Sequence, residues 1–169
     1  TREQIVPLSE GALDLGPLRN TQLPDTLAWE RVLREPPLAM VPANHPLARQ
    51  PSVSLAALAR GPFAFFDPHV GTGRYDDILG LLRRYGHTPK IAQEVGEAMT
   101  IIGLVAAGLG VSILPASCQR CQLSEMLWLP IDEQDAVSEM WLVWSKHHGQ
   151  GALAKRFREA LLSWKSEHN

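Results

Sequence analysis

The pattern of apolar and polar positions alternates between short apolar runs and amphipathic stretches, which predicts an α/β fold. Apolar residues recur at helical spacing in Ile78, Leu81, Leu82 and Tyr85, so a helix is expected over 75–85. A mostly apolar helix over 98–107 and a C-terminal helix over 152–164 are also expected. The remaining apolar runs predict strands or extended segments at 12–18, 27–35, 37–43, 62–66, 90–95, 111–114, 126–131 and 139–144.

Capping residues indicate two further helices. Thr1 and Gln4 have the spacing of a capping box, which predicts a first helix that runs to Glu10 and stops at Gly11. Ser54 is a suitable N-cap for a brief helix over 54–59. Three other polar or aromatic features are expected to be structural: His45 fixes the turn before Pro46, Asp14 caps or pairs locally, and Trp141 and Trp144 face opposite sides of one strand.

The order of the elements predicts two lobes. Between residues 62 and 115 the chain reads strand, helix, strand, helix, strand, and right-handed crossovers of this kind make a small parallel sheet. The segments before and after it are expected to form a second lobe that the chain leaves and later rejoins. Subdomain I is therefore predicted to consist of residues 1–36 and 140–169, and subdomain II of residues 37–139, with a ligand-binding cleft between them.

Composition narrows the class of protein. The 169 residues carry 16 Lys and Arg against 18 Asp and Glu, a net charge of −2, and 45% of them are hydrophobic. This is an ordinary globular composition, compatible with one compact domain or two small lobes. Nucleic-acid binding relies on many basic side chains, so the slightly acidic balance argues against nucleic-acid binding by this chain itself.

No targeting signal is recognisable. The start, Thr1-Arg2-Glu3-Gln4, lacks the apolar region of a secretory peptide, and the longest apolar run, 101–114, is shorter than the ~20 residues that span a bilayer. We therefore expect no membrane association and a cytoplasmic location. Because position 1 is not Met, we expect the chain to begin partway through a longer protein.

The two cysteines, Cys118 and Cys121, form a Cys-x-x-Cys pair. This spacing occurs in redox motifs and in one half of a zinc site. The sequence has no second pair, and His147-His148 is the local cluster that could complete a tetrahedral site. The simplest interpretation is two ordinary thiols one helical turn apart, with redox or metal chemistry as the alternative. We predict no metal site and no cofactor.

Three stretches carry a family resemblance: 10–16 (EGALDLG) followed by Arg19, 41–48 (VPANHPLA) and 104–115 (LVAAGLGVSILP). In this order and spacing, over essentially the whole chain, they resemble the effector-binding domain of LysR-type transcriptional regulators. The stretch 66–75 (FDPHVGTGRY) looks most like the branch that regulates aromatic-compound catabolism, which includes benzoate- and muconate-responsive activators.

The resemblance implies a type 2 periplasmic-binding-protein-like fold of two Rossmann-like subdomains with a cleft between them. It also implies that the N-terminal winged helix-turn-helix, a linker helix and the first strand–helix–strand of the effector domain lie outside this chain, so that DNA is contacted only through a part absent here. A homo-oligomer, dimer or tetramer, is implied for the full-length protein. The implied role is control of transcription by a small aromatic or dicarboxylic acid.

The effectors of such regulators are usually small organic anions, and an anion site needs helix N-termini and hydroxyl groups. Backbone N–H groups at a helix start and the helix dipole both favour negative charge there. Thr1 heads the first predicted helix and could donate its hydroxyl, or could only cap that helix. Arg19 follows a predicted strand, and its planar guanidinium suits a carboxylate, although a solvated surface role is the alternative.

Two more helix starts complete the candidate effector site. In the loop before the helix expected over 75–85, Gly71 and Gly73 allow close backbone approach, Thr72 offers a hydroxyl and Arg74 a charge, and Tyr75 either closes on an aromatic ring or packs. The next helix begins with Glu97, Ala98 and Met99, and Met99 either lines an apolar pocket or belongs to the core.

Two other functional classes are weaker. An α/β enzyme is disfavoured because the chain carries no G-x-S-x-G elbow, no P-loop, no H-E-x-x-H and no close carboxylate pair with an obvious role. A solute-binding protein of a transport system would share the fold, and the missing signal peptide disfavours it. The sequence alone leaves the effector, the DNA site and the sign of regulation open.

Overall fold

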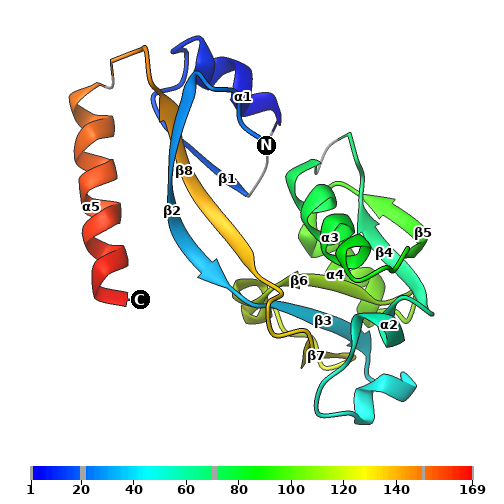
Figure 1. The fold of residues 1–169 in the computed structure, drawn as a ribbon. Helices are drawn as coiled ribbons and strands as arrows, with labels where there is room; N and C mark the ends of the chain where they lie inside the picture. Colours follow the sequence, from blue (N-terminus) through cyan, green and yellow to red (C-terminus); the bar gives the residue numbers. More distant parts are fainter. Residues whose placement is uncertain (1, 20–21, 70–71, 150, 169) are drawn as a thin grey trace. The chain divides into compact units, whose positions relative to one another are not determined.

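The computed structural model describes residues 2–19, 22–69, 72–149 and 151–168. The chain divides into two compact units: unit 1 contains Thr1–Arg34 and Glu139–Asn169, and unit 2 contains Glu35–Ser138. Both combine helices and strands (Figure 1). Among the described residues, no helix combines the length and the apolar character needed to cross a membrane.

Unit 1 is built on a three-stranded sheet in the order β1-β8-β2, formed by β1 (Gly16–Arg19), β8 (Ser138–Ser145) and β2 (Leu27–Glu35). Strand β1 runs antiparallel to β8, with Leu18 opposite Trp141. Helices α1 (Arg2–Ser9) and α5 (Ala152–His168) complete the unit. One face of the sheet packs with α1 in a small core, which consists of Leu8, Leu18, Leu27, Trp141 and Val143.

The other face of this sheet lies under α5. The Arg158 guanidinium of α5 lies 4.7 Å from the Trp144 ring centroid, whereas Trp141 belongs to the core on the α1 face. The prediction that these two tryptophans face opposite sides is therefore confirmed. A charged contact between the Lys165 Nζ and Glu30 Oε1, 3.4 Å apart, joins α5 to β2 as well.

Three sequence predictions for unit 1 change in detail. The strand expected over 12–18 is confined to β1, because the Leu13 N–H donates to the Pro7 carbonyl and folds residues 10–15 back on the end of α1. The stop at Gly11 is confirmed by its left-handed φ of 76°, which glycine adopts readily. Asp14 does not pair locally: its Oδ1 accepts from the Gly151 N–H, 3.4 Å away, just before α5.

Unit 2 holds the larger core and two sheets. Its elements, in chain order, are β3 (Pro37–Pro42), the 3₁₀ helix η1 (Pro46–Arg49), α2 (Leu55–Leu58), β4 (Pro62–Phe66), α3 (Thr72–Arg84), β5 (Lys90–Val95), α4 (Ala98–Ala106), β6 (Ser112–Pro115), the 3₁₀ helix η2 (Ala116–Arg120) and β7 (Met126–Pro130). Fully buried residues at the centre of the core include Phe63, Phe65, Leu82, Ile101 and Ile113.

The expected parallel sheet is only partly correct. Strands β4 and β5 are parallel, as predicted, but β6 pairs antiparallel with β3 in a separate sheet of order β6-β3-β7. Among the described residues, Val111 alone bridges to β4 in parallel, donating to the Pro62 carbonyl at 2.8 Å and accepting from the Ala64 N–H at 3.0 Å. The third strand therefore forms a backbone bridge to β4 at Val111, while the Ser112 hydroxyl donates to the Ala64 carbonyl at 2.7 Å, and β6 pairs with β3.

Local polar contacts fix the short turns of unit 2. The Ser54 hydroxyl accepts from the Ala57 N–H and caps α2, and the His45 Nδ1 accepts from the Leu47 N–H before η1. Both sequence predictions are confirmed. Helix α3 begins at Thr72 rather than at residue 75, so Gly73 and Arg74 belong to its first turn. In the sequence, Gly71 and Gly73 instead predict a loop before residue 75.

Candidate functional site

The parallel pairing of β4 and β5 brings two helix starts to one edge of their sheet. Parallel strands end at the same edge, and the ladder continues beyond β4, where the Asp67 N–H donates to the Val95 carbonyl at 2.9 Å. Helix α3 follows the end of β4, and α4 follows the end of β5 (Figure 1). The backbone N–H groups of both first turns therefore lie at the carboxyl edge, where α/β sheets bind ligands and where an anion is favoured.

The first turn of α3 is fixed on β4 by aromatic contacts. The Arg74 guanidinium lies 5.4 Å from the Phe66 ring centroid, and the Tyr75 ring meets Phe65 edge to face with centroids 5.1 Å apart. Gly73, between the loop and these residues, is buried. Tyr75 is therefore partly buried against the core of unit 2, while Arg74 places a positive charge over the last residue of β4.

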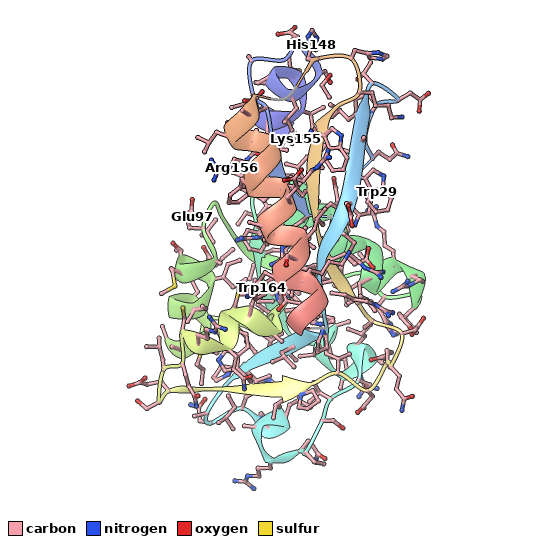
Figure 2. The ribbon with its side chains drawn as sticks, turned by 90° about the vertical axis from the view of Figure 1, so that its left-hand side faces the viewer. Trp29, Glu97, His148, Lys155, Arg156 and Trp164 are labelled. Carbon is pink, nitrogen blue, oxygen red and sulfur yellow. The ribbon has the colours of Figure 1, made fainter. Side chains whose placement is uncertain are left out.

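The first turn of α4 supplies a different set of groups. Glu97 is the N-cap residue in extended conformation (φ −122°, ψ 140°), its side chain makes no capping hydrogen bond, and it is exposed just before the helix (Figure 2). Ala98 packs partly against the core. Met99 is 60% exposed, so the interpretation of Met99 as a core residue is wrong.

Arg19 belongs to unit 1, where it ends β1 opposite Met140. Only 7% of it is exposed, which excludes the role of a solvated surface arginine. Thr1 and Gly71 lie outside the described residues, as does the side chain of Thr72. The structure thus groups Gly73, Arg74, Tyr75, Glu97, Ala98 and Met99 at one sheet edge of unit 2, and holds Arg19 separately in unit 1.

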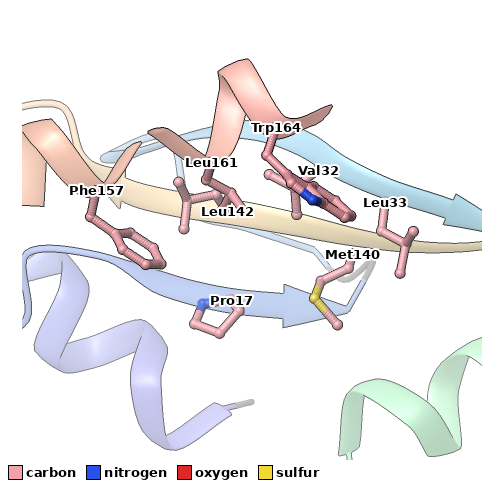
Figure 3. Close-up of a pocket in the computed structure, with 8 residues that line it drawn as sticks. All are labelled: Pro17, Val32, Leu33, Met140, Leu142, Phe157, Leu161 and Trp164. Carbon is pink, nitrogen blue, oxygen red and sulfur yellow. The ribbon is translucent and has the colours of Figure 1, made fainter. Parts of the chain in front are cut away.

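An apolar cavity of about 300 Å³ lies within unit 1, between α5 and the sheet (Figure 3). It lacks the charged groups that the anion hypothesis needs, since its lining consists of Pro17, Val32, Leu33, Met140, Leu142, Phe157, Leu161 and Trp164. Sequence reasoning did not find this cavity, although Phe157, Leu161 and Trp164 were recognisable as one face of the C-terminal helix.

Comparison with known proteins decides the family. A family model described as "LysR substrate binding domain" matches residues 1–166. The chain belongs to this LysR family. It is 68% identical over 163 residues to the uncharacterized HTH-type transcriptional regulator YnfL of Escherichia coli, covering 96% of this chain and 55% of the relative. It is 32% identical over 143 residues to the HTH-type transcriptional regulator CatR of Pseudomonas putida, covering 84% of this chain and 49% of the relative. The LysR domain described here therefore spans about half the length of these relatives.

Solved structures agree on the fold. The BenM effector-binding domain with its effector benzoate matches with a TM-score of 0.85, covering 99% of this chain and 76% of that one at 24% identity. The effector-binding domain of QuiR in complex with shikimate matches with a TM-score of 0.87, covering 99% of this chain and 79% of that one at 24% identity. The LysR domain has the type 2 periplasmic-binding-protein-like α/β fold. Two of its relatives are named as HTH-type transcriptional regulators.

The LysR domain contains one polar group at this edge that sequence reasoning did not single out. Asp67 directly follows β4, and its Oδ1 accepts from the His69 N–H at 2.7 Å. Its position after the apolar run 62–66 was the available signal, because ligand-binding groups gather after parallel strands. Asp67 and Glu97 place carboxylates after β4 and β5, at the same sheet edge as the start of α3, so an anionic ligand is favoured near the helix N-termini and the Arg74 guanidinium rather than near these two side chains.

Proposed function

We propose that this LysR domain senses a small organic acid, aromatic or dicarboxylic, and thereby controls transcription. The observation that carries the proposal is the pair of helix starts at one edge of the β4–β5 sheet, with the Arg74 guanidinium held over Phe66. Backbone N–H groups and a guanidinium are the donors that a carboxylate accepts. BenM in complex with benzoate and QuiR in complex with shikimate support the class of ligand, since both ligands are carboxylic acids.

Each proposed contact has a distinct role. Arg74 pairs with the carboxylate, and the backbone N–H of Gly73 in the first turn of α3 donates to it. Ala98, Met99 and Tyr75 offer apolar surface to the body of the acid, and an exposed thioether such as that of Met99 packs well on an aromatic ring. The exposed Glu97 at the α4 start disfavours a second negative charge close to it.

Calorimetric titration of the chain with benzoate, cis,cis-muconate and shikimate tests the proposal. At least one acid is expected to bind, whereas benzamide, the neutral analogue of benzoate, is not. Arg74→Ala is expected to weaken binding by roughly 10-fold or more, because a hydrogen bond to a charged group contributes about 1.5–3 kcal/mol. Arg83→Ala, in the last turn of the same helix, is the matched control and is expected to leave the affinity unchanged.

Two results would overturn the proposal. One is the absence of heat with every acid while circular dichroism shows the chain folded. The other is an equal effect of Arg74→Ala and Arg83→Ala on the affinity. Response to benzoate or muconate, rather than to shikimate alone, is what the aromatic-catabolism branch requires.

The remaining roles concern the full-length protein. We propose that it is cytoplasmic, that it acts as a homodimer or homotetramer, and that it contacts DNA through a helix-turn-helix outside this chain. The names of the relatives as HTH-type regulators support the helix-turn-helix. Gel-shift assays with the full-length protein and the region upstream of its own gene, with and without the acid that binds, test it. An unchanged shift pattern at saturating acid contradicts the regulatory role.

A further inference from the structure

The two cysteines of the chain lie at the two ends of one turn. Neither forms a disulfide in this structure: Cys118 lies within the 3₁₀ helix η2, and Cys121 is its C-cap residue. The Cys121 N–H donates to the Cys118 carbonyl with an N···O distance of 3.0 Å, which closes the turn. The sequence contains no other cysteine, so an intramolecular disulfide can join only these two.

The geometry of this turn suits a disulfide. A turn closed by a hydrogen bond from residue i+3 to residue i holds its end Cα atoms within about 7 Å. Disulfides accept Cα separations of about 4.4–6.8 Å. The hydrogen bond that closes the turn therefore holds the two cysteines close to the separation that a disulfide needs.

The turn is held in place from its N-terminal side. The Ala116 N–H donates to the Pro36 carbonyl at 3.0 Å. The Ser117 N–H donates to the Glu35 Oε2 at 2.6 Å, and its hydroxyl donates to the Glu35 Oε1 at 3.1 Å. Because Glu35 is buried, these bonds fix η2 on the body of unit 2, and the thiols do not need to be ordered before they react.

The two thiols differ in exposure. Cys121 is exposed, whereas Cys118 is half-buried and packs against the core of unit 2. An oxidant from solvent therefore reaches Cys121 first, and Cys118 is the thiol placed to resolve the product. This asymmetry is typical of redox-sensing pairs, in which an accessible cysteine reacts and a neighbour completes the disulfide.

We propose that Cys118 and Cys121 form a reversible disulfide in response to a peroxide, which makes η2 an oxidation-sensitive turn. The Cys121 sulfur attacks one peroxide oxygen, the O–O bond breaks, and a sulfenic acid and one water form. The Cys118 sulfur then attacks the sulfenic sulfur, the S–O bond breaks, the S–S bond forms, and a second water leaves. The two sulfurs give two electrons to the peroxide, and a dithiol reductant reverses the reaction.

Treatment of the chain with hydrogen peroxide, followed by iodoacetamide and intact-mass measurement, tests the proposal. The expected product has lost two hydrogens, takes up no alkyl group and migrates as a monomer on a non-reducing gel, and dithiothreitol restores both alkylation sites. In the Cys118→Ser chain the reaction is expected to stop at a sulfenic acid that dimedone traps. In the Cys121→Ser chain, the half-buried Cys118 is expected to remain alkylatable after the same exposure.

Three results would overturn the proposal in a chain shown to be folded by circular dichroism. Peroxide-treated protein that still takes up two alkyl groups would exclude the disulfide. Products joined between chains would exclude the intramolecular pair. Oxidation of Cys121 to sulfinic or sulfonic acid in the unaltered chain, without the loss of two hydrogens, would exclude Cys118 as its resolving partner.

Discussion

At the scale of single residues, the buried side chain of Glu35 holds the 3₁₀ helix η2 in place. It accepts from both the N–H and the hydroxyl of Ser117, across 82 positions of sequence. Removal of the Glu35 side chain leaves the N–H and the hydroxyl of Ser117 without their acceptor. The loss of a hydrogen bond to a charged group costs more free energy than the loss of a bond between neutral groups.

We therefore expect Glu35→Ala to lower the free energy of unfolding by about 1–3 kcal/mol. Urea denaturation followed by circular dichroism measures the change. Glu30→Ala is the control, because its contact with Lys165 is long and partly exposed, with 42% of the Glu30 side chain accessible, and such pairs contribute at most about 1 kcal/mol. Equal losses for the two variants would show that the Glu35–Ser117 bonds do not stabilise the fold.

Substitution by alanine is expected to change the free energy of unfolding in opposite directions at two glycines, Gly110 and Gly103. A Cβ at Gly110, where φ is 151°, would lie 2.7 Å from the Pro62 carbonyl oxygen, so Gly110→Ala forces backbone apart. We expect Gly110→Ala to lower the free energy of unfolding by about 1–3 kcal/mol or more. A Cβ at Gly103, inside α4, meets nothing within 4 Å among the described residues, and Gly103→Ala is expected to stabilise by about 0.4–1 kcal/mol. Thermal melts of both variants check the signs, and a shared sign contradicts this account.

At the scale of elements, the apolar spacing of α3 translates directly into burial. Ile78, Leu81 and Leu82, which the sequence assigns to one face, are at most 9% exposed. The final helix differs, because Leu153 at its start is 82% exposed and lies off the packed face. The same residue type thus occupies opposite environments on two helices.

Leu82→Ala is expected to cost about 2–5 kcal/mol, since it opens a cavity at a fully buried position. Leu153→Ala, the matched control, is expected to change the free energy of unfolding by less than about 0.5 kcal/mol. Denaturant titration of both variants measures the difference. A loss at Leu153 comparable to that at Leu82 would mean that α5 buries a face other than the one described.

The elements themselves were largely predictable, and their partners were not. Strands β4 and β5 match the predicted ranges, because a short apolar run bounded by Gly or Pro is a local signal. The pairing of β6 with β3 joins Ala39 to Ile113, more than 70 positions apart, and no local pattern encodes that choice. The shortened β1 has a similar cause, since the Leu13 to Pro7 bond competes with the strand.

The candidate site was predictable to a similar degree. The helix starts at Thr72 and Ala98 follow apolar runs, so their arrival at one edge could be inferred from strand order. The burial of Arg19 could not be inferred in this way, because arginine is usually exposed and the residues that bury Arg19 come from strands distant in sequence. The exposure of Met99 was likewise hidden, since an apolar residue beside an apolar helix run looks like core in the sequence.

At the scale of the whole molecule, the two units have cores of different size. The core on the α1 face of unit 1 contains Leu8, Leu18, Leu27, Trp141 and Val143 among the described residues, and the core of unit 2 is several times larger. Regions with fewer buried apolar contacts open at lower free energy. The units should therefore differ in local stability even though one chain forms both.

We expect amides of β8, the central strand of unit 1, to exchange with solvent faster than those of β3, the central strand of the β6-β3-β7 sheet. Hydrogen exchange read out by mass spectrometry on peptides from 138–145 and 37–42 measures this. The comparison is matched, because both strands have a neighbour on each side. Slower exchange in β8 than in β3 would contradict the inferred order of stability.

The stack of Trp29 on Trp141, with centroids 4.0 Å apart and planes inclined by 16°, has an optical consequence. Of the five tryptophans, Trp128 belongs to unit 2 and the other four to unit 1. Indole rings stacked this closely couple their electronic transitions, so unit 1 carries a chromophore pair that unit 2 lacks. The intrinsic emission and near-ultraviolet dichroism of the chain therefore report mainly on unit 1. A Trp128→Phe variant makes the tryptophan emission a reporter of unit 1 alone, which allows this half of the LysR domain to be followed separately.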